Sequence, residues 1–308
     1  MKTGLFINTA EAICSIYESG VMIYSAIKSS DKFKLDILNL SRDSILKNSF
    51  SIPDGYDFYI INWHHVALPV NKDAIKNLPG KKISVLLEIS PESVFNFAHS
   101  DWFDIYMAID PTKTKTGNVY PFPRPLEIAN NIKPLLDKIS FGSFGLHIPG
   151  KRFEDIVKVA TSLNEDCIVR INICQGDYVG NQNVNLYFNF LRKMSGNKVD
   201  LRLTSDYMDK QELISWCSEH TLNVFPYYRS QPGLSATTDQ AISTGRALAV
   251  TYCDTFRHIH KYISYFPKQS YLQLIESTPE GVSQMQKDWH PKEFLKTFEE
   301  MLIEENIL

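Results

Sequence analysis

Short apolar runs alternate with segments of helical periodicity along most of the chain. In the first half, apolar runs at Leu5–Ile7, Tyr56–Ile61 and Lys82–Ile89 are separated by polar and helical segments, beginning with a helical pattern over Ala10–Ile27. Short apolar runs bounded by turns are typical of buried strands, and an amphipathic period of 3.6 is typical of helices. This alternation predicts βαβ units around a parallel sheet.

The second half repeats the alternation. Three segments carry helical periodicity, and each lies between short apolar runs that read as strands. The predicted helices cover Phe153–Leu163, Val184–Met194 and Lys210–His220, and the predicted strands cover 140–145, 167–173, 199–203, 222–226 and 247–252. The sequence therefore predicts a second doubly wound α/β domain of similar size.

A proline-rich segment separates the two halves. Thr112–Pro125 contains three prolines in five residues, a pattern that neither a helix nor a central strand accommodates. We expect it to be the linker between an N-terminal domain of residues 1–123 and a C-terminal domain of residues 124–308. The second domain is expected to include an amphipathic helix near Trp289–Leu302. Two such domains would face each other across a cleft, and ligands of open α/β sheets bind beyond the carboxyl ends of the strands.

Charge and hydropathy exclude several classes of protein. The 32 basic and 35 acidic side chains give 32 − 35 = −3, too balanced for a protein that binds a long polyanion such as nucleic acid. No apolar run approaches the roughly 18 residues of a membrane span. The start of the sequence, from Met1 to Ile7, lacks the apolar region of a signal peptide. We therefore expect a cytoplasmic protein, and peripheral membrane contact stays open.

The cysteines and histidines do not form a metal-binding pattern. There is no C-x-x-C, no H-x-x-x-H and no D-x-D in the chain. The odd number of widely spaced cysteines indicates buried thiols in a reducing compartment. They are Cys14, Cys167, Cys174, Cys217 and Cys253. No metal site and no metal cofactor are expected.

The segment from Asn223 to Thr251 carries the most chemical information. It reads as a buried strand, a glycine-containing loop, a helix with a hydroxyl-rich first turn, and another buried strand. Ser235 or Thr237 is expected to cap the helix, leaving its N–H groups to favour a phosphate, and Asp239 lies in the first turn. The residues alone leave phosphate binding and an ordinary capped helix as equal alternatives.

This segment resembles the C-terminal domain of retaining, family-4-like glycosyltransferases of the GT-B fold. Gln240–Gly245 fits the E-A-x-A-x-G part of the family pattern, and Gly233 and Leu234 fit the small loop before it. The resemblance implies the GT-B fold, with two Rossmann-like domains facing a central cleft. It also implies that Gly233, Leu234 and Ser235 contact the nucleotide-sugar donor.

The two glutamates of the family motif are absent. Aligned on Gly245, their positions hold Pro232 and Gln240, whereas Gln231 and Asp239 keep the same separation one residue earlier. Either Asp239 takes over the sugar-binding and catalytic role after a slight rotation of the helix, or the site is altered.

A second match lies at the start of the C-terminal domain. Phe144–Phe153 resembles the family's G-R-x-x-x-x-K-G loop. The resemblance implies that Gly145 lets the backbone approach the donor and that Lys151 supplies a charge to its diphosphate. The family's arginine falls on a leucine, and Arg152 is the neighbouring cation that compensates in this interpretation. The alternative for this loop alone is a turn with two solvated cations.

The remaining matches are matches of position. Tyr207 and Met208 follow a strand where the family holds the nucleobase, although Tyr207 equally fits an ordinary surface aromatic residue. Gly20, where the first helical pattern is expected to break, stands in place of the family's glycine-rich loop. His64 or His65, with His64 preferred, follows a buried strand where the family places a histidine beside the donor sugar. A histidine pair that packs under a loop is the alternative.

The resemblance implies a glycosyltransferase that moves a sugar from a UDP- or GDP-linked donor, with retention, and without a metal. The acceptor is a glycan, a lipid-linked glycan or a small molecule. Lys151, Asp239 and His64 are the expected catalytic residues. The alternatives are an inactive nucleotide-sugar-binding protein, a partner of an active transferase, and a sugar-nucleotide epimerase of the same fold. A NAD-dependent dehydrogenase is disfavoured, because no G-x-G-x-x-G follows the first strand.

Overall fold

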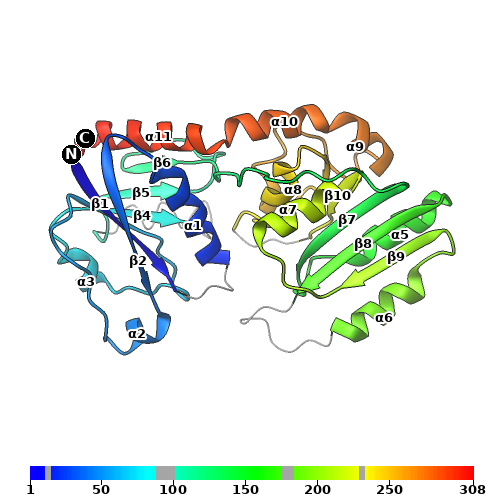
Figure 1. The fold of residues 1–308 in the computed structure, drawn as a ribbon, viewed down its shortest axis with the longest axis horizontal. Helices are drawn as coiled ribbons and strands as arrows, with labels where there is room; N and C mark the ends of the chain where they lie inside the picture. The colour runs from blue at the N-terminus through cyan, green and yellow to red at the C-terminus, as the bar shows by residue number, and fades with distance from the viewer. Residues whose placement is uncertain (11–14, 88–100, 175–183, 229–232) are drawn as a thin grey trace. The chain divides into compact units, whose positions relative to one another are not determined.

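The computed structural model describes residues 1–10, 15–87, 101–174, 184–228 and 233–308. The chain divides into two compact units. The first unit comprises Met1–Pro125, Pro232–Leu234 and Asp288–Leu308, and the second comprises Leu126–Gln231 and Ser235–Lys287. Each unit is wound around a parallel sheet of its own (Figure 1).

The first unit contains a six-stranded sheet in the order β2-β1-β3-β4-β5-β6, in which all neighbouring strands pair in parallel. The strands are β1 (Lys2–Thr9), β2 (Phe33–Leu40), β3 (Phe58–Ile61), β4 (Lys81–Leu86), β5 (Ile105–Ala108) and β6 (Val119–Pro121). Helices α1 (Ser15–Ile27), α2 (Arg42–Leu46) and α3 (Lys72–Lys76) follow the first three strands. The strand order reverses direction between β1 and β3.

Both faces of this sheet are buried. Phe6 and Ile60 point into the cluster that includes side chains of α1, whereas Leu5, Ile7 and Tyr59 point into the cluster that includes side chains of α2 and α3. A strand buried on both faces needs apolar residues at every position. This is why β3 reads as a continuous apolar run in the sequence, whereas β2, at the end of the sheet order, alternates with polar residues.

The predicted linker contains a strand. Within Thr112–Pro125, which was expected to join the domains without a helix or a central strand, β6 (Val119–Pro121) pairs in parallel with β5. The proline is tolerated because β6 is the last strand in the sheet order, where only one side of the backbone is paired. The chain then runs without helix or strand from residue 122 to residue 138.

The C-terminal helix belongs to the first unit. Helix α11 (Pro291–Glu304), red in Figure 1, contributes Phe294 and Phe298 to the cluster that also holds Phe6 and Ile23 of the first unit. The Tyr120 hydroxyl donates to Glu305 just beyond the helix at 2.6 Å. The amphipathic pattern near Trp289–Leu302 does form a helix, but its place in the first unit differs from the expected domain of residues 124–308.

The second unit contains a five-stranded sheet in the order β11-β10-β7-β8-β9, again with parallel pairs. Its strands are β7 (Ile139–Leu146), β8 (Cys167–Cys174), β9 (Val199–Thr204), β10 (Leu222–Phe225) and β11 (Ala247–Val250). Its helices are α5 (Phe153–Leu163), α6 (Val184–Met194), α7 (Lys210–Ser218), α8 (Thr237–Ser243), α9 (Tyr271–Ser277) and α10 (Pro279–Asp288), the last two of which the sequence analysis did not anticipate. The strand order reverses between β7 and β10.

Alternate residues of β10 face opposite sides of the sheet. Leu222 and Val224 join the cluster formed with α5 and α6, whereas the ring of Phe225 meets that of Phe144, which in turn meets Trp216 of α7. The predicted doubly wound α/β architecture is confirmed in both units. No helix in the described part of the chain is long and apolar enough to cross a membrane.

Candidate functional site

The reversal of strand order in the second sheet marks a place where a ligand can reach the backbone. In open parallel sheets, ligands bind beyond the carboxyl ends of the strands, at the point where the strand order reverses. In the second unit this point lies between β7 and β10, so the relevant segments are those that follow Gly145 and Phe225. Both segments were singled out in the sequence.

Lys151 is buried at this point. A turn after β7 returns the chain, and the backbone N–H of Tyr228 donates to the Gly150 carbonyl at 2.7 Å, which ties this turn to the end of β10. Lys151 is only 6% exposed, and its ammonium nitrogen lies 3.7 Å from the centre of the Tyr227 ring. Solvated cations were the alternative for this loop, and the burial of Lys151 contradicts that alternative for this residue.

Gly145 makes room for the ammonium group. Its φ of +146° is one that residues with a side chain rarely adopt. A Cβ at this position would lie 3.3 Å from Nζ of Lys151 and 3.4 Å from the Tyr227 hydroxyl. The close approach that the resemblance implies for Gly145 is therefore present, and the group nearest to its missing side chain is the predicted cation.

Three hydroxyl groups form a connected chain next to the lysine. The Tyr227 hydroxyl lies 2.9 Å from Oγ1 of Thr237, and that oxygen lies 2.8 Å from Oγ of Ser235. The Tyr227 hydroxyl also donates to the Phe144 carbonyl at 3.4 Å. These groups, with Lys151, place a cation and several hydrogen-bond donors at one end of the sheet.

The expected helix cap is wrong in detail. Helix α8 begins at Thr237, and its N-cap is Ala236, which has no side chain that can accept from the helix. Ala236 has helical angles (φ −80°, ψ −16°), so the chain turns one residue early and the Ser235 hydroxyl meets Thr237 instead of a backbone N–H. Seven residues make α8 a short helix.

Asp239 and Gln240 are both buried in α8. Asp239 is 1% exposed, and its carbonyl accepts from the Ser243 hydroxyl at 3.0 Å. Gln240 stands where the family pattern has its second glutamate. Gln231 and Pro232, the other two positions of that comparison, lie outside the described residues, and the catalytic role of Asp239 stays a prediction.

Arg152 is occupied by other groups. It has a left-handed backbone conformation with φ of 52°, and its Nε lies 2.6 Å from Oδ2 of Asp155. Its guanidinium carbon lies 5.8 Å from the centre of the Tyr228 ring. This ion pair holds Arg152 at the start of α5, and its donor contact stays a prediction.

Gly233 and Leu234 precede the hydroxyl chain. They group with the first unit, whereas Ser235 groups with the second. Leu234 is buried, and the Ser235 backbone N–H donates to the Thr255 carbonyl at 3.1 Å. The next segment places Phe256 against Tyr227, with ring centres 5.2 Å apart, so it supports the site by packing.

Tyr207 and Met208 lie in the loop that follows β9. Asn172 of β8 holds this loop, because its side-chain nitrogen donates to the Asp206 carbonyl at 2.9 Å. Tyr207 is 54% exposed. Both residues line a groove of about 540 Å³ that runs along α7 as far as Trp216. The loop of Tyr207 and Met208 follows the carboxyl end of β9, which at about 4.8 Å per strand lies roughly 10 Å from β7 across β8, whereas the rest of the groove runs along α7 away from this edge.

In the first unit, His64 forms a turn. Its Nδ1 accepts from the backbone N–H groups of Val66 at 3.1 Å and Ala67 at 3.0 Å. A neutral ring that accepts at Nδ1 carries its proton on Nε2, so His64 has a donor on the other side. His65 stacks on it, with ring centres 4.6 Å apart. The expected place at the end of β3 is observed, and contact with a donor sugar stays a prediction.

Gly20 lies inside a helix. Helix α1 runs through Ser19 and Gly20, so the predicted break at this point is wrong. A Cβ on Gly20 would lie 2.3 Å from Oδ1 of Asn8 and 2.5 Å from Nδ2 of Asn62, at the ends of β1 and β3. The glycine lets α1 approach the sheet, and this packing explains it without a ligand. Its predicted donor contact stays untested.

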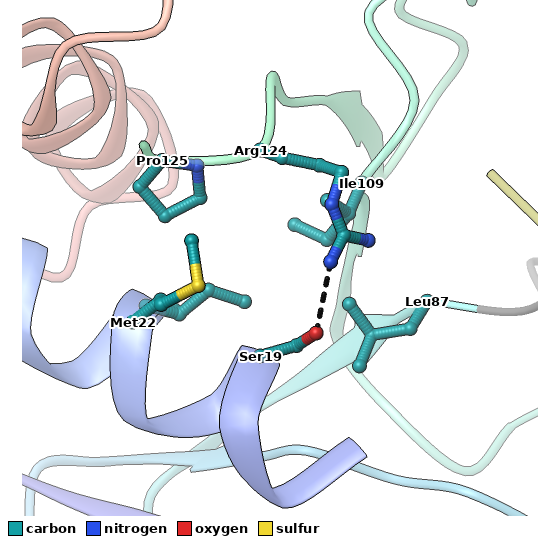
Figure 2. A pocket seen from close by; sticks show the side chains of 7 residues that line it. Ser19, Met22, Leu87, Ile109, Arg124 and Pro125 are labelled. Atoms are coloured by element: carbon teal, nitrogen blue, oxygen red, sulfur yellow. Dashed lines mark hydrogen bonds between the residues drawn. The ribbon is translucent and has the colours of Figure 1, made fainter. Parts of the chain in front are cut away.

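A buried arginine, Arg124, contacts α1 at Ser19, the residue before Gly20. Nη2 of Arg124 donates to the Ser19 hydroxyl at 2.9 Å, as Figure 2 shows. The pocket beside them, between Met22 and Leu87, has about 10 Å³, room for one water molecule at most. This hydrogen bond therefore holds the segment around Arg124 against α1, and the pocket beside it is too small for a ligand.

Sequence reasoning missed Tyr227 and Thr237 as site residues. Tyr227 and Tyr228 stand together after a strand, and only alternation could separate them: Tyr227 shares the parity of the buried Phe225, whereas Tyr228 is 74% exposed. Thr237 was considered only as a helix cap. Their shared position beside Lys151 is a property of the folded chain.

No protein-family model matches the chain, and no curated protein sequence matches it either. Solved structures do. Anabaena HepE in complex with UDP-glucose is 10% identical with a TM-score of 0.67, over 99% of this chain and 100% of that one. Sucrose-phosphate synthase from Thermosynechococcus elongatus is 10% identical with a TM-score of 0.63, over 99% of both chains. Trehalose-6-phosphate synthase OtsA is 10% identical with a TM-score of 0.63, over 98% and 99%.

At this identity, the likeness concerns the fold. It extends over nearly the whole chain, including both sheets and the C-terminal helix that joins the first unit. The chain therefore has the GT-B fold that the two sequence matches predicted.

Proposed function

We propose that this protein is a glycosyltransferase that moves a sugar from a nucleoside diphosphate sugar, foremost a UDP-linked sugar, to an acceptor hydroxyl group with retention of configuration. The fold it shares with HepE in complex with UDP-glucose supports this choice of donor. The sequence match around Gly145 and Lys151 lies at the reversal point of the second sheet, and the match at Gln240–Gly245 lies in and just after α8, whose first residue is Thr237. The acceptor is a glycan, a lipid-linked glycan or a small molecule.

One observation carries the proposal: the buried ammonium group of Lys151 beside the hydroxyl groups of Tyr227, Thr237 and Ser235. When the bond between the sugar's anomeric carbon and the diphosphate oxygen breaks, negative charge grows on the diphosphate. A fixed cation and hydroxyl donors stabilise that charge more in the transition state than in the bound donor, which increases the rate.

The other predicted residues keep their roles in this proposal. We assign the nucleobase to the end of the groove at Tyr207 and Met208, because the loop that carries them follows the carboxyl end of β9, roughly 10 Å from β7. Asp239 and His64 keep their proposed roles towards the transferred sugar. Lys151 takes the role of the counter-charge, so the proposal requires no metal ion, and it keeps the expected cytoplasmic location.

The test is a panel of UDP- and GDP-linked sugars, with release of the nucleoside diphosphate and mass spectrometry of the products as readouts. We expect turnover with a UDP-linked donor that continues in EDTA. Tight UDP binding with no release from any donor, with glycan and lipid acceptors present, would contradict an enzyme. Epimerised free sugar would indicate the epimerase alternative.

A nucleotide-sugar-binding protein without transferase activity is the second candidate. The observation that favours it is the neutral Gln240, buried at the position of a family glutamate, together with an Asp239 that is only 1% exposed. Such a protein would bind UDP and a UDP-sugar with similar affinity and release no product, which separates it from the transferase in the same panel.

A further inference from the structure

Tyr227 contacts both Lys151 and Thr237 in the candidate diphosphate site, and Thr237 links it to Ser235. It is fully buried two residues after the end of β10. Its ring meets the Lys151 ammonium group on one side and packs against Phe225 and Phe256, with ring centres 5.9 Å and 5.2 Å away. Its hydroxyl reaches Thr237 and the Phe144 carbonyl.

We infer that Tyr227 is a positioning residue, which holds the Lys151 ammonium group with its ring and orients the Thr237 and Ser235 hydroxyls with its own hydroxyl, so that all three are presented to one diphosphate. The inference rests on the proposed function and adds a residue that neither sequence match contains.

The ring contributes to the placement of the Lys151 ammonium group. An aromatic face attracts a cation through its quadrupole. At 3.7 Å from the centre of the Tyr227 ring, the ammonium group of Lys151 is held beside the hydroxyl of the same tyrosine.

The hydroxyl chain explains how donors reach the same anion. Tyr227, Thr237 and Ser235 are joined by contacts of 2.9 Å and 2.8 Å, in which either atom can donate. If the Tyr227 proton turns from the Phe144 carbonyl to Thr237, Thr237 donates to Ser235, and the Ser235 proton is left for a phosphate oxygen. Hydrogen bonds in such a chain polarise and strengthen one another.

The packing fixes the ring. Phe225 and Phe256 contact Tyr227 edge-on or tilted, with interplanar angles of 83° and 34°. The Thr251 hydroxyl also donates to the Tyr227 carbonyl, which anchors its backbone to the end of β11. The ring and the backbone of Tyr227 are therefore both held. A substitution of its side chain should change ligand affinity by altering the positions of Lys151 and Thr237.

The experiment measures dissociation constants of inorganic pyrophosphate, UDP and uridine by calorimetry. The variants are Tyr227→Phe, which keeps the ring, and Tyr227→Leu, which removes it, with the exposed neighbour Tyr228→Leu as the matched control. We expect pyrophosphate and UDP to bind about fivefold more weakly to Tyr227→Phe, the loss of one hydrogen bond, and at least about thirtyfold more weakly to Tyr227→Leu. Uridine affinity and the control should change less than about twofold.

A double-mutant cycle separates positioning from general packing. In a Lys151→Met background, Tyr227→Leu should weaken pyrophosphate binding by no more than the fivefold that belongs to the hydroxyl, because the ring then has no cation to hold. The full thirtyfold loss in that background, or an equal loss of uridine binding, would overturn the inference. If the leucine variant does not fold, Tyr227→Phe still tests the inference. An unchanged pyrophosphate affinity in Tyr227→Phe would show that the Tyr227 hydroxyl does not orient donors towards the diphosphate.

The two proposals fail differently. If the wild-type protein binds neither pyrophosphate nor UDP, the proposed function and the inference are both wrong. If the wild type binds both ligands and the Tyr227 variants bind them as well as the Tyr228 control does, only the inference is wrong.

Discussion

The side-chain nitrogen of Asn62 donates to Oδ1 of Asn8 at 2.8 Å, and this buried pair joins the ends of β3 and β1. The same nitrogen donates to the Ile16 carbonyl at 2.8 Å, and Nδ2 of Asn8 donates to the Tyr17 carbonyl at 3.1 Å. The two asparagine side chains thus donate hydrogen bonds to backbone carbonyls in the first turn of α1, at the point where the strand order of the first sheet reverses. The helix can come this close only because its next turn presents Gly20.

Replacement of Gly20 by alanine should destabilise the first unit. Alanine is the better helix former, but its Cβ would lie 2.3 Å from Oδ1 of Asn8, so the helix or the asparagine pair has to move. We expect a loss of roughly 1–3 kcal/mol in the free energy of unfolding, measured by urea denaturation. Ser25→Ala, at an exposed position of the same helix, should change it by less than about 0.5 kcal/mol. A stable Gly20→Ala protein that has lost donor binding would instead favour the predicted ligand contact.

Lys151→Met should weaken UDP binding far more than uridine binding. The substitution removes a buried charge and keeps the length of the side chain, and a hydrogen bond to a charged group contributes about 1.5–3 kcal/mol, or roughly 10- to 100-fold in affinity. Calorimetry with both ligands measures the difference. Lys158→Met, at an exposed lysine paired with Asp155 at 3.6 Å, is the control. Equal losses of UDP and uridine would place Lys151 away from the diphosphate.

Gly145→Ala should reduce UDP affinity by about tenfold, because its Cβ would crowd Nζ of Lys151. The altered backbone also costs roughly 1–3 kcal/mol of stability. Gly117→Ala controls for strain, since Gly117 has φ of +55° and no atom within 4 Å of an added Cβ. Both variants should lose stability, and only the first should lose affinity. A similar affinity in both would show that strain alone accounts for Gly145.

Asp239→Asn should lower turnover by roughly a hundredfold and leave UDP affinity within about twofold, if Asp239 acts on the transferred sugar as predicted. Steady-state kinetics and calorimetry give the two numbers. Asp110→Asn, at a buried aspartate of the first unit whose Oδ1 accepts from the Thr112 hydroxyl at 2.7 Å, controls for the loss of a buried charge. An unchanged rate would return Asp239 to a purely structural place in α8.

Acid should destabilise the second unit through His220. Burial, with the nearby Arg170 cation, lowers the pKa of His220 to about 3, from an ordinary value of 6.5. Between these values the unfolded chain binds one proton that the folded chain does not, so stability falls as the pH falls from 6.5 towards 3, by about 1.4 kcal/mol per pH unit from this group. Denaturation at pH 6.5, 5.5 and 4.5 should show a shallower dependence in His220→Asn. An unchanged slope would contradict the shift.

The elements of this fold were predictable where packing alone decides them. Helices α5 and α6 begin and end at the predicted residues, because their apolar period and their polar ends agree. The strand β6 was not predicted, since prolines exclude a central strand but not a strand at the end of the sheet order. That distinction depends on strand order, which the local sequence does not carry.

The candidate site was predictable in part for a similar reason. Gly145 and Lys151 belong to a local motif, so a short resemblance found both. Tyr227 and Thr237 come from different segments and meet Lys151 only after β7 and β10 lie side by side. The helix break predicted at Gly20 was wrong because a glycine that lets a helix approach a sheet looks the same in sequence as a glycine that interrupts a helix.

The place of α11 bears on the order in which the protein is completed during synthesis. The strands and helices of the second unit are all made by residue 288, whereas the core of the first unit still lacks Phe294, Phe298, Met301 and Leu302 at that point. Domains fold as units while the chain emerges. The first unit, whose sheet is translated before the second unit, therefore completes its core only after the second unit has been made, when α11 supplies these four side chains.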